Sequence, residues 1–512
     1  MTTTTPAPPQ GKGLATGTLG LFGSTVIGLA STAPVYSLVA TLGFVVLAVG
    51  PQAPIAFIIA FVPMFFVAFA YQELNRAVPD CGTTFTWATK AFGPRVGWMG
   101  GWGVAVAGMV VLANLAQIGG KYLWLLIYPD FASNTLVVTL TGVVFIAVMT
   151  WISYRGTEIG EKLQNVLLGL QYLALVVFVI AVIVAISTGQ APEGSTMPSL
   201  EWFNPFAFAD FSGFIEAVLL ALFIYWGWDT CLALNEETKD PQRTPGRAAI
   251  LSTLILLVTY VGVTVAAMSY AGLGDTGLGL GNEANAQDVF FALKDVLLGP
   301  VGILLVIAVM VSAVSSTQTT ILPTARGTLA MAVYKALPKR FGTVHPKYKT
   351  PAFSTIVMGI VSTVFYVGMT IISEDFLSDT ILSLGLAIAF YYAITGFSCV
   401  WFFRKTLFSS FRNVILRFCF PLLGALMLTA AFVLSAIDMF DPDYGYTVIF
   451  GIGGVFVIGI GALAIGVVLM IVWSFFRGSR PFFRGESLNE ETEVLVPDEV
   501  SPPVRSVDGG LA

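Results

Sequence analysis

Residues 211–234, FSGFIEAVLLALFIYWGWDTCLAL, are long and apolar enough to cross a membrane, but they carry an interruption near their middle. There the tetrapeptide Trp226-Gly227-Trp228-Asp229 places a glycine beside an ionisable carboxyl group. Broken helices at membrane depth are tolerated only where they line a cavity or are buried in protein. The segment therefore predicts a membrane helix that is broken at a functional site.

The composition of the whole chain indicates that it consists largely of such segments. Of the 512 residues, 56% are hydrophobic and only 11% are charged, against about a quarter charged in ordinary globular domains. The apolar runs are continuous rather than alternating, so they predict helices and not a transmembrane barrel. Twelve runs lie near residues 17–47, 53–75, 96–127, 134–153, 162–187, 211–234, 248–271, 300–334, 352–371, 377–403, 414–437 and 446–475. These runs predict an all-α polytopic membrane protein in the lipid bilayer.

Several classes of protein are disfavoured by the charged and metal-binding residues. The net charge is −5 without a basic block, so no nucleic-acid partner is expected. One histidine and four cysteines without CxxC spacing make a metal site improbable, and no cofactor is expected. No phosphate-binding loop is present, so ATP is not expected to drive the protein.

The lysines and arginines predict the orientation of the chain. With both termini in the cytoplasm, 23 of the 25 basic residues lie inside, and only Lys121 and Lys294 lie outside. This asymmetry follows the positive-inside rule and requires an even number of spans. We therefore expect a multi-pass protein of the plasma membrane with cytoplasmic N- and C-termini.

The first span carries a second interruption. Glycines at 17, 20, 23 and 28 precede Ser31, Thr32 and Pro34, and the proline frees a carbonyl within the span. Spans one and six begin two halves of five spans each, and breaks in corresponding spans point to an inverted-repeat transporter site. We expect a disordered tail at 1–13, a permease domain at 14–475 and a disordered tail at 476–512. Within that domain, the repeats cover about 17–187 and 211–403, and two extra helices occupy about 414–475.

Three ordered motifs show that the chain resembles the amino acid–polyamine–organocation permeases. They are AYQELNRAVPDCGTTFTWATKAFGP (Ala70–Pro94), GWDTCLALNEETKDPQRTPGRAAI (Gly227–Ile250) and TARGTLAMA (Thr324–Ala332). The resemblance implies the fold of sodium-coupled amino acid transporters, with ten core helices in two inverted repeats plus two. It also implies a cytoplasmic gate whose salt bridges form and break, against the alternative of solvated interfacial charges. The gate candidates are Glu73, Glu236, Glu237, Arg243 and Arg326.

The same resemblance implies a coupling or ion site between spans one, five and eight. In sodium-coupled relatives of the fold, hydroxyls of span eight and carbonyls of span one hold a cation, and Ser315 and Ser316 could do so here or could bond Gln171. Some proton-coupled relatives carry a lysine where this chain has Gln171. A neutral amide does not titrate, so Gln171 cannot act as a lysine-type proton switch. A coupling proton is expected all the same, in preference to sodium.

The substrate site is expected at the two breaks, where helix ends supply amides for a carboxylate and carbonyls for an ammonium group. In the first break, Ala30 stands where family members have a second glycine. Asp229 either binds a substrate ammonium or a proton, or caps the helix that restarts after the break. Glu216, in the outer half of span six, either attracts a cationic amine or is simply solvated. The candidate substrate-binding residues are Ile27, Gly28, Ala30, Ser31, Phe223, Trp226, Gly227 and Asp229.

The sequence thus predicts a secondary transporter that imports an amino acid by proton-coupled symport or exchange. The first alternative is a polyamine or other organic cation carrier on the same fold, which Glu216 and Asp229 favour. A membrane-embedded enzyme and a non-transporting amino acid receptor are the remaining alternatives. The oligomeric state is not predicted.

Overall fold

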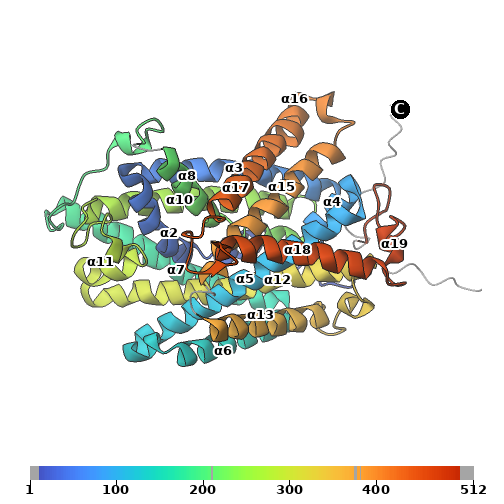
Figure 1. Ribbon diagram of the computed structural model, residues 1–512, viewed down its shortest axis with the longest axis horizontal. Coiled ribbons are helices and arrows are strands. Elements are labelled where there is room, and N and C mark those ends of the chain that lie inside the picture. Colours follow the sequence, from blue (N-terminus) through green and yellow to red (C-terminus); the bar gives the residue numbers. More distant parts are fainter. Residues whose placement is uncertain (1–10, 209–210, 374–377, 381, 496–512) are drawn as a thin grey trace, which may run out of the picture.

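The computed structural model describes residues 11–208, 211–373, 378–380 and 382–495, and their regular structure is almost entirely helical (Figure 1). Within these ranges, ten helical stretches are long and apolar enough to cross a membrane. One of them, residues 21–77, contains two of the predicted spans. The broken sixth span falls outside the ten because each of its pieces is short. The predicted all-α polytopic fold is therefore confirmed.

Each five-span half begins with a broken helix. The first half comprises α1 (Leu21–Ser31), α2 (Pro34–Val49), α3 (Ala53–Ala77), α4 (Thr84–Phe92), α5 (Pro94–Ile127), α6 (Thr135–Arg155) and α7 (Thr157–Ser187). The second comprises α8 (Phe211–Phe223), α9 (Thr230–Ala233), α10 (Thr244–Ala271), α11 (Val289–Leu298), α12 (Ile303–Val333), α13 (Ala352–Ile372) and α15 (Leu384–Phe402).

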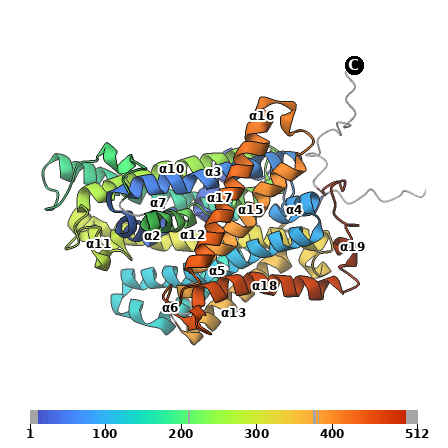
Figure 2. The same ribbon diagram turned by 45° about the horizontal axis from the view of Figure 1, so that its top comes forward.

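The C-terminal part adds two further spans. It contains α16 (Phe411–Asn413), a π-helical turn (Val414–Cys419), α17 (Phe420–Asp438), α18 (Gly454–Ser474) and α19 (Arg480–Phe483). Between α17 and α18, the short strands β1 (Val448–Ile449) and β2 (Ile452–Gly453) pair antiparallel, with Val448 opposite Gly453. In Figures 1 and 2, α17 runs steeply across the other helices, whereas α18 lies along α5.

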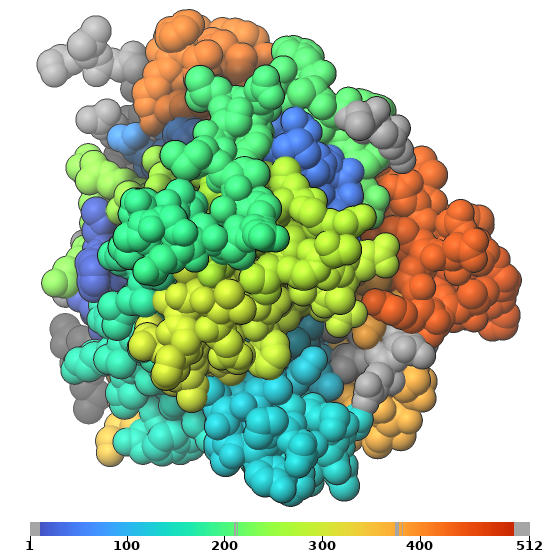
Figure 3. All heavy atoms as spheres, turned by 90° about the vertical axis from the view of Figure 1, so that its left-hand side faces the viewer, coloured from blue at the N-terminus to red at the C-terminus, as the bar shows by residue number. Residues whose placement is uncertain are grey.

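The bundle has two ends that matter for the site. We call one end the terminal face, because segments 11–19, 234–243, 334–351 and 475–495 meet there. Backbone bonds from Leu19 to Glu237 and from Ala15 to Lys349 hold the first of these segments in place. The opposite end, seen in Figure 3, carries the connections 188–208 and 272–302 and is called the loop face.

The ends of the chain differ from the sequence-based prediction. Residues 11–13 and 476–495, expected within disordered tails, pack on the terminal face. Lys12 is buried between two carboxylates, and Phe482 of α19 and Leu488 are fully buried among apolar side chains. Disorder is therefore wrong for these residues, while 1–10 and 496–512 lie outside the described residues.

Candidate functional site

The first span is broken where the sequence predicts it. α1 ends at Ser31, and α2 begins at Pro34 after Ala33, which adopts a left-handed backbone (φ 47°, ψ 61°). Pro34 occupies the first turn of α2, where its missing N–H removes no helical hydrogen bond. The end of α1 therefore presents carbonyls and the start of α2 presents amides that lack partners within their own helices.

The directions of α1 and α2 at this break show that Gly28 to Ser31, which are predicted to contribute to the substrate site, cannot supply free amides to it. These residues form the last turns of α1, where backbone amides bond to carbonyls one turn earlier, so they are not free to bind a carboxylate. At the start of α2, Pro34 has no N–H, the Tyr36 amide donates to Ser312 Oγ (3.2 Å) and the Ser37 amide donates to the Ala33 carbonyl (2.8 Å). The Val35 amide is therefore the first-turn amide of α2 that lacks a partner among the described residues. Gly28 serves packing, because a Cβ atom added to it would lie 2.7 Å from Ser252 Oγ on α10.

The sixth span is broken between α8 and α9, and its turn packs directly against the first break. Gly227 has φ +114°, a conformation that residues with side chains rarely adopt, and an added Cβ atom would lie 2.7 Å from the Ser31 carbonyl oxygen. The hydroxyls of Ser31 and Thr230 are 2.8 Å apart. The structure thus brings the two predicted breaks into contact and explains why a glycine is required at 227.

Asp229 is bound by two tyrosines of α15 that were not predicted. Tyr392 donates its hydroxyl to Asp229 Oδ1 (2.9 Å) and Tyr391 donates to Oδ2 (3.1 Å), while Trp226 Nε1 donates to the Tyr391 hydroxyl. The side chain of Asp229 makes no capping bond to α9, so the helix-cap interpretation is wrong. Adjacent tyrosines within an otherwise apolar span were the available signal.

A small cavity of about 10 Å³ lies between the breaks, α5, α12 and α15. Ser31, Trp226 and Asp229, three of the residues predicted to bind substrate, line it. Thr320 and Thr324 of α12 also line it, and their buried hydroxyls have no hydrogen-bond partner among the described residues. The cavity has room for about one water molecule, so this conformation is closed around the site.

The other five predicted substrate-binding residues do not line this cavity. Gly28 and Gly227 make the close packing contacts described above. Ile27 packs with Leu19, Leu234 and Leu322 toward the terminal face, and Ala30 is fully buried in the main hydrophobic core. Phe223 lines a larger cavity toward the loop face.

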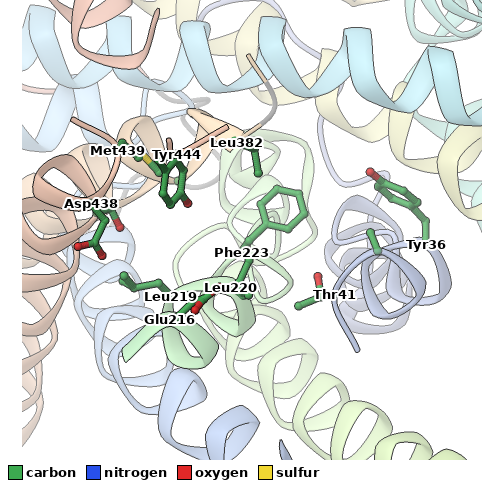
Figure 4. Close-up of a pocket in the computed structure, with 13 residues that line it drawn as sticks. Tyr36, Thr41, Glu216, Leu219, Leu220, Phe223, Leu382, Asp438, Met439 and Tyr444 are labelled. Carbon is green, nitrogen blue, oxygen red and sulfur yellow. The ribbon is translucent and has the colours of Figure 1, made fainter. Parts of the chain in front are cut away.

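That larger cavity, of about 180 Å³, is called the vestibule and is shown in Figure 4. Phe223 and Glu216 project from α8, Tyr36 comes from α2, and Asp438 lies on the opposite side. Among the described residues that line the vestibule, two are carboxylates and none is basic. Because Phe223 ends α8 and Tyr36 lies in the first turn of α2, the vestibule leads to both breaks.

The candidate coupling site is only partly assembled as expected. Ser316 Oγ donates to the Ser31 carbonyl (2.9 Å), so span eight does contact the end of α1. Ser315 Oγ donates to Gln164, whose Nε2 donates to the Ser315 carbonyl (3.1 Å). Gln171 is buried, and neither of its amide atoms has a partner within the described ranges. Of the two alternatives for Ser315 and Ser316, a bond to Gln171 is not formed in the described structure, and Gln164 is the partner that the sequence reasoning missed.

Buried ion pairs close the terminal face. Arg326 Nε lies 2.5 Å from Glu237 Oε1, and both side chains are almost completely buried. Glu73 pairs with two arginines before α17, Arg412 and Arg417. These pairs join span eight to span six and span two to span eleven.

Arg243 departs from its predicted role. It forms no ion pair in the part of the chain that the structure describes. Thr157, by contrast, hydrogen-bonds both Glu237 and Arg326 and belongs to the closed terminal face, although it was not predicted.

A third buried ion cluster involves the N-terminal segment. Lys12 Nζ lies 2.7 Å from Asp80 and 2.6 Å from Glu236, and Tyr334 donates its hydroxyl to Asp80 (2.7 Å). Burial alone would raise the pKa of Asp80, but the charge of Lys12 and the hydrogen bonds outweigh it and hold that pKa below its ordinary value. Burial raises the pKa of Glu236 despite the opposing charge of Lys12. Ligand atoms of Asp80, Cys81 and Glu236 lie within 4.8 Å of one another, and the Lys12 ammonium group supplies a cation there.

A helical membrane protein with paired helix breaks at membrane depth has the architecture of a secondary transporter. A family model described as amino acid permease matches residues 18–481, and the chain therefore belongs to that family. It is accordingly a multi-pass membrane permease and not an enzyme.

Individual relatives differ in the substrates that their names give. The chain is 28% identical over 228 residues to the branched-chain amino acid permease BcaP of Lactococcus lactis, over 42% of this chain and 48% of that protein. The match therefore spans about half of the Lactococcus permease. The low-affinity putrescine importer PlaP of Escherichia coli is 27% identical over 81% of this chain and 88% of its own. The methylthioribose transporter of Bacillus subtilis is 25% identical over 67% of this chain and 73% of its own length.

Proposed function

We propose that this permease is a plasma-membrane secondary transporter that imports an amino acid by alternating access, coupled to protons or by exchange. The distribution of lysines and arginines supports cytoplasmic termini, and in this proposal the terminal face is the inner end and the vestibule opens to the outside. The observation that carries the proposal is the contact between the two helix breaks, where Gly227 packs on Ser31 beside the Asp229 carboxylate. This contact places two helix breaks, a carboxylate and the unpartnered hydroxyls of Thr320 and Thr324 around one point.

The chemistry of that point suits an amino acid. The start of α2, with its Val35 amide, favours a carboxylate because it is the positive end of a helix dipole. The carbonyls at the end of α8 and the Asp229 carboxylate favour an ammonium group. Thr320 and Thr324 offer hydroxyls to whatever polar atoms the substrate brings.

Substrate binding must be accompanied by movement. A cavity of about 10 Å³ cannot hold an amino acid, whereas the vestibule of about 180 Å³ can accept one at its mouth. Trp226 and Tyr391, which are bonded to each other and line the small cavity, are the side chains that must separate. The ion pairs at the terminal face keep the opposite exit closed while this happens, as alternating access requires.

Uptake into proteoliposomes tests the proposal. Labelled amino acids of each chemical class and labelled putrescine are supplied with an inward proton gradient, with and without an uncoupler. Accumulation of an amino acid that collapses with the uncoupler supports symport, and uptake that needs internal substrate supports exchange. Binding without flux would contradict the proposal.

A polyamine or organic cation carrier is the second candidate, because acidic groups follow the proposed path. Glu216 and Asp438 line the vestibule, and Asp229 lies at the breaks below it. Carboxylates along a path attract cations and raise their local concentration. If putrescine is the substrate, Glu216→Gln and Asp438→Asn should raise its apparent KM, whereas the KM of a neutral amino acid should change little.

A further inference from the structure

Two cavities toward the terminal face adjoin each other. The smaller one also reaches Thr324, which lines the small cavity at the helix breaks from its other side. The first, of about 740 Å³, lies between the end of α12 with the following turn and the end of α18. The second, of about 230 Å³, lies between α5, α12 and α13. Leu337 lines both cavities, so they meet at this residue. In Figure 1, α18, α5, α12 and α13 run alongside one another toward the end of the bundle that carries α19.

The larger cavity has the chemistry of an anion site. Lys335, Lys339 and Arg477 line it, and none of the described residues that line it is acidic. None of these three cations forms an ion pair with any described carboxylate. Trp473 also lines the cavity, and its buried Nε1 donor has no acceptor among the described residues. Three unpaired cations and an unused indole donor therefore share one cavity.

The smaller cavity has the chemistry of a hydrocarbon site. Its walls include Trp98, Trp102, Met109, Met358 and Val361. The hydroxyls of Thr328 and Ser354 at its edge donate to backbone carbonyls, at 2.9 Å each. The hydroxyls of these two residues are thus already satisfied, while Thr324 Oγ1, at the end toward the helix breaks, has no partner among the described residues. The rest of the cavity offers mainly apolar contact.

We propose that the paired cavities form a binding site for an anionic phospholipid. The phosphate headgroup contacts Lys339, Arg477 and Trp473, and one acyl chain passes Leu337 into the cavity beside α13. The basic cavity lies at the end of the bundle and suits a charged headgroup, and the apolar cavity next to it suits an acyl chain. Basic pockets between membrane helices bind anionic headgroups through the same charge complementarity. The proposal does not depend on which substrate is transported.

The test compares lipid retention by the full chain, purified in detergent, using native mass spectrometry. Phosphatidylglycerol is the anionic probe and phosphatidylcholine is the neutral one. The variant Lys339→Gln/Arg477→Gln removes two charges from the cavity and leaves Lys335, whose backbone has φ +64°, untouched. Lys162→Gln/Lys405→Gln removes two exposed charges that line neither cavity.

We expect phosphatidylglycerol to be retained in preference to phosphatidylcholine. The cavity variant should weaken that retention by about tenfold or more, since each basic residue near an anionic lipid contributes severalfold to binding. The control variant should bind as the unmodified chain does, and circular dichroism should show equal helical content in all three proteins.

The apolar cavity is tested separately with Val357→Phe, which narrows it. Weaker retention of phosphatidylglycerol by this variant supports the placement of an acyl chain there. Equal retention of both lipids, or an equal loss in the control variant, would overturn the proposal. Unchanged retention in Val357→Phe would overturn the acyl-chain position.

Discussion

The Gly227 backbone lies so close to Ser31 that a Cβ atom on residue 227 would stand 2.7 Å from the Ser31 carbonyl oxygen. Two helices that belong to different halves of the chain therefore meet through their broken parts. This contact could not form with any residue larger than glycine, both because of the distance and because of the positive φ of 114°. The paired breaks in turn create the free helix ends on which the proposed substrate site depends.

Replacing Gly227 by alanine should abolish transport while the protein still reaches the membrane. The methyl group must displace the Ser31 carbonyl or force the turn into another conformation. Gly262→Ala is the matched control, because a Cβ atom at this position in α10 meets nothing within 4 Å. Uptake and surface expression are measured for both variants, and substantial flux in Gly227→Ala would contradict the role of the contact.

Asp229→Asn should impair transport more strongly than loss of either tyrosine bond. The amide keeps the shape of the side chain but loses the charge that would bind an ammonium group. Tyr392→Phe removes one hydrogen bond to that carboxylate, and bonds to charged groups contribute about 1.5–3 kcal/mol. A tenfold or greater loss of kcat/KM is therefore expected for the tyrosine variant.

Tyr366→Phe is the control for the tyrosine series, since Tyr366 is equally buried but bonds Gln117 away from the breaks. Initial uptake rates over a range of substrate concentrations give the comparison. Wild-type kinetics in Asp229→Asn would show that the carboxylate does not contact the substrate.

Removing one member of the Arg326–Glu237 pair should destabilise the protein by about 3–5 kcal/mol, because the remaining charge is buried without compensation. The double variant Arg326→Met/Glu237→Gln should recover most of that loss. The exposed pair Lys162–Glu158, with side chains 73% and 67% exposed, supplies the control. Lys162→Met should change stability by well under 1 kcal/mol. Unfolding of the purified variants is the measurement, and additive losses in the double variant would contradict the coupling.

Acidification should favour the closed terminal face through Glu236. Burial raises the pKa of this carboxyl in the closed form, whereas exposure on opening returns it toward its ordinary value of about 4.3. A proton held more tightly by the closed form stabilises that form below the raised pKa, and the contribution is lost as the pH rises through it. The pKa of Asp80 is lowered in the closed form, so its effect on the equilibrium has the opposite sign. That effect appears only as the pH falls toward and below the ordinary aspartate pKa of about 3.9.

Spin labels attached at Lys162→Cys and Lys405→Cys can report this opening. The labelled protein is a variant in which the four native cysteines are replaced by serine. The closed population in the distance distribution should grow as the pH is lowered from 7.5 toward the ordinary glutamate pKa of about 4.3. In Glu236→Gln that growth should disappear. An increase of the open population on acidification would contradict the predicted effect of Glu236 protonation on the closed form.

The positions of the helix breaks can be predicted from the sequence, but the side chains that contact each break cannot. Gly227, Asp229 and Pro34 interrupt apolar runs, and such interruptions are visible without any knowledge of packing. The bonds from Tyr391 and Tyr392 to Asp229 join spans six and ten, so they depend on how the halves pack. Periodicity within a single span does not contain that information.

Gln164 and Lys12 illustrate the same limit. Gln164 and Gln171 are seven residues apart and lie on one face of α7, but only the register of α7 against α12 decides that Gln164 meets Ser315. Lys12 sits in a polar terminal sequence typical of disorder, yet two buried carboxylates contributed by distant segments hold it in place. A polar stretch can be ordered by charges that lie elsewhere in the chain.

The most direct test of the central claim is uptake by proteoliposomes of the unmodified chain and of Gly227→Ala, side by side. The panel contains labelled amino acids of each class and putrescine, under an inward proton gradient. We predict accumulation of an amino acid or amine by the unmodified chain and none by the variant. Absence of flux for every compound, or equal flux in both proteins, would contradict transport at the paired helix breaks.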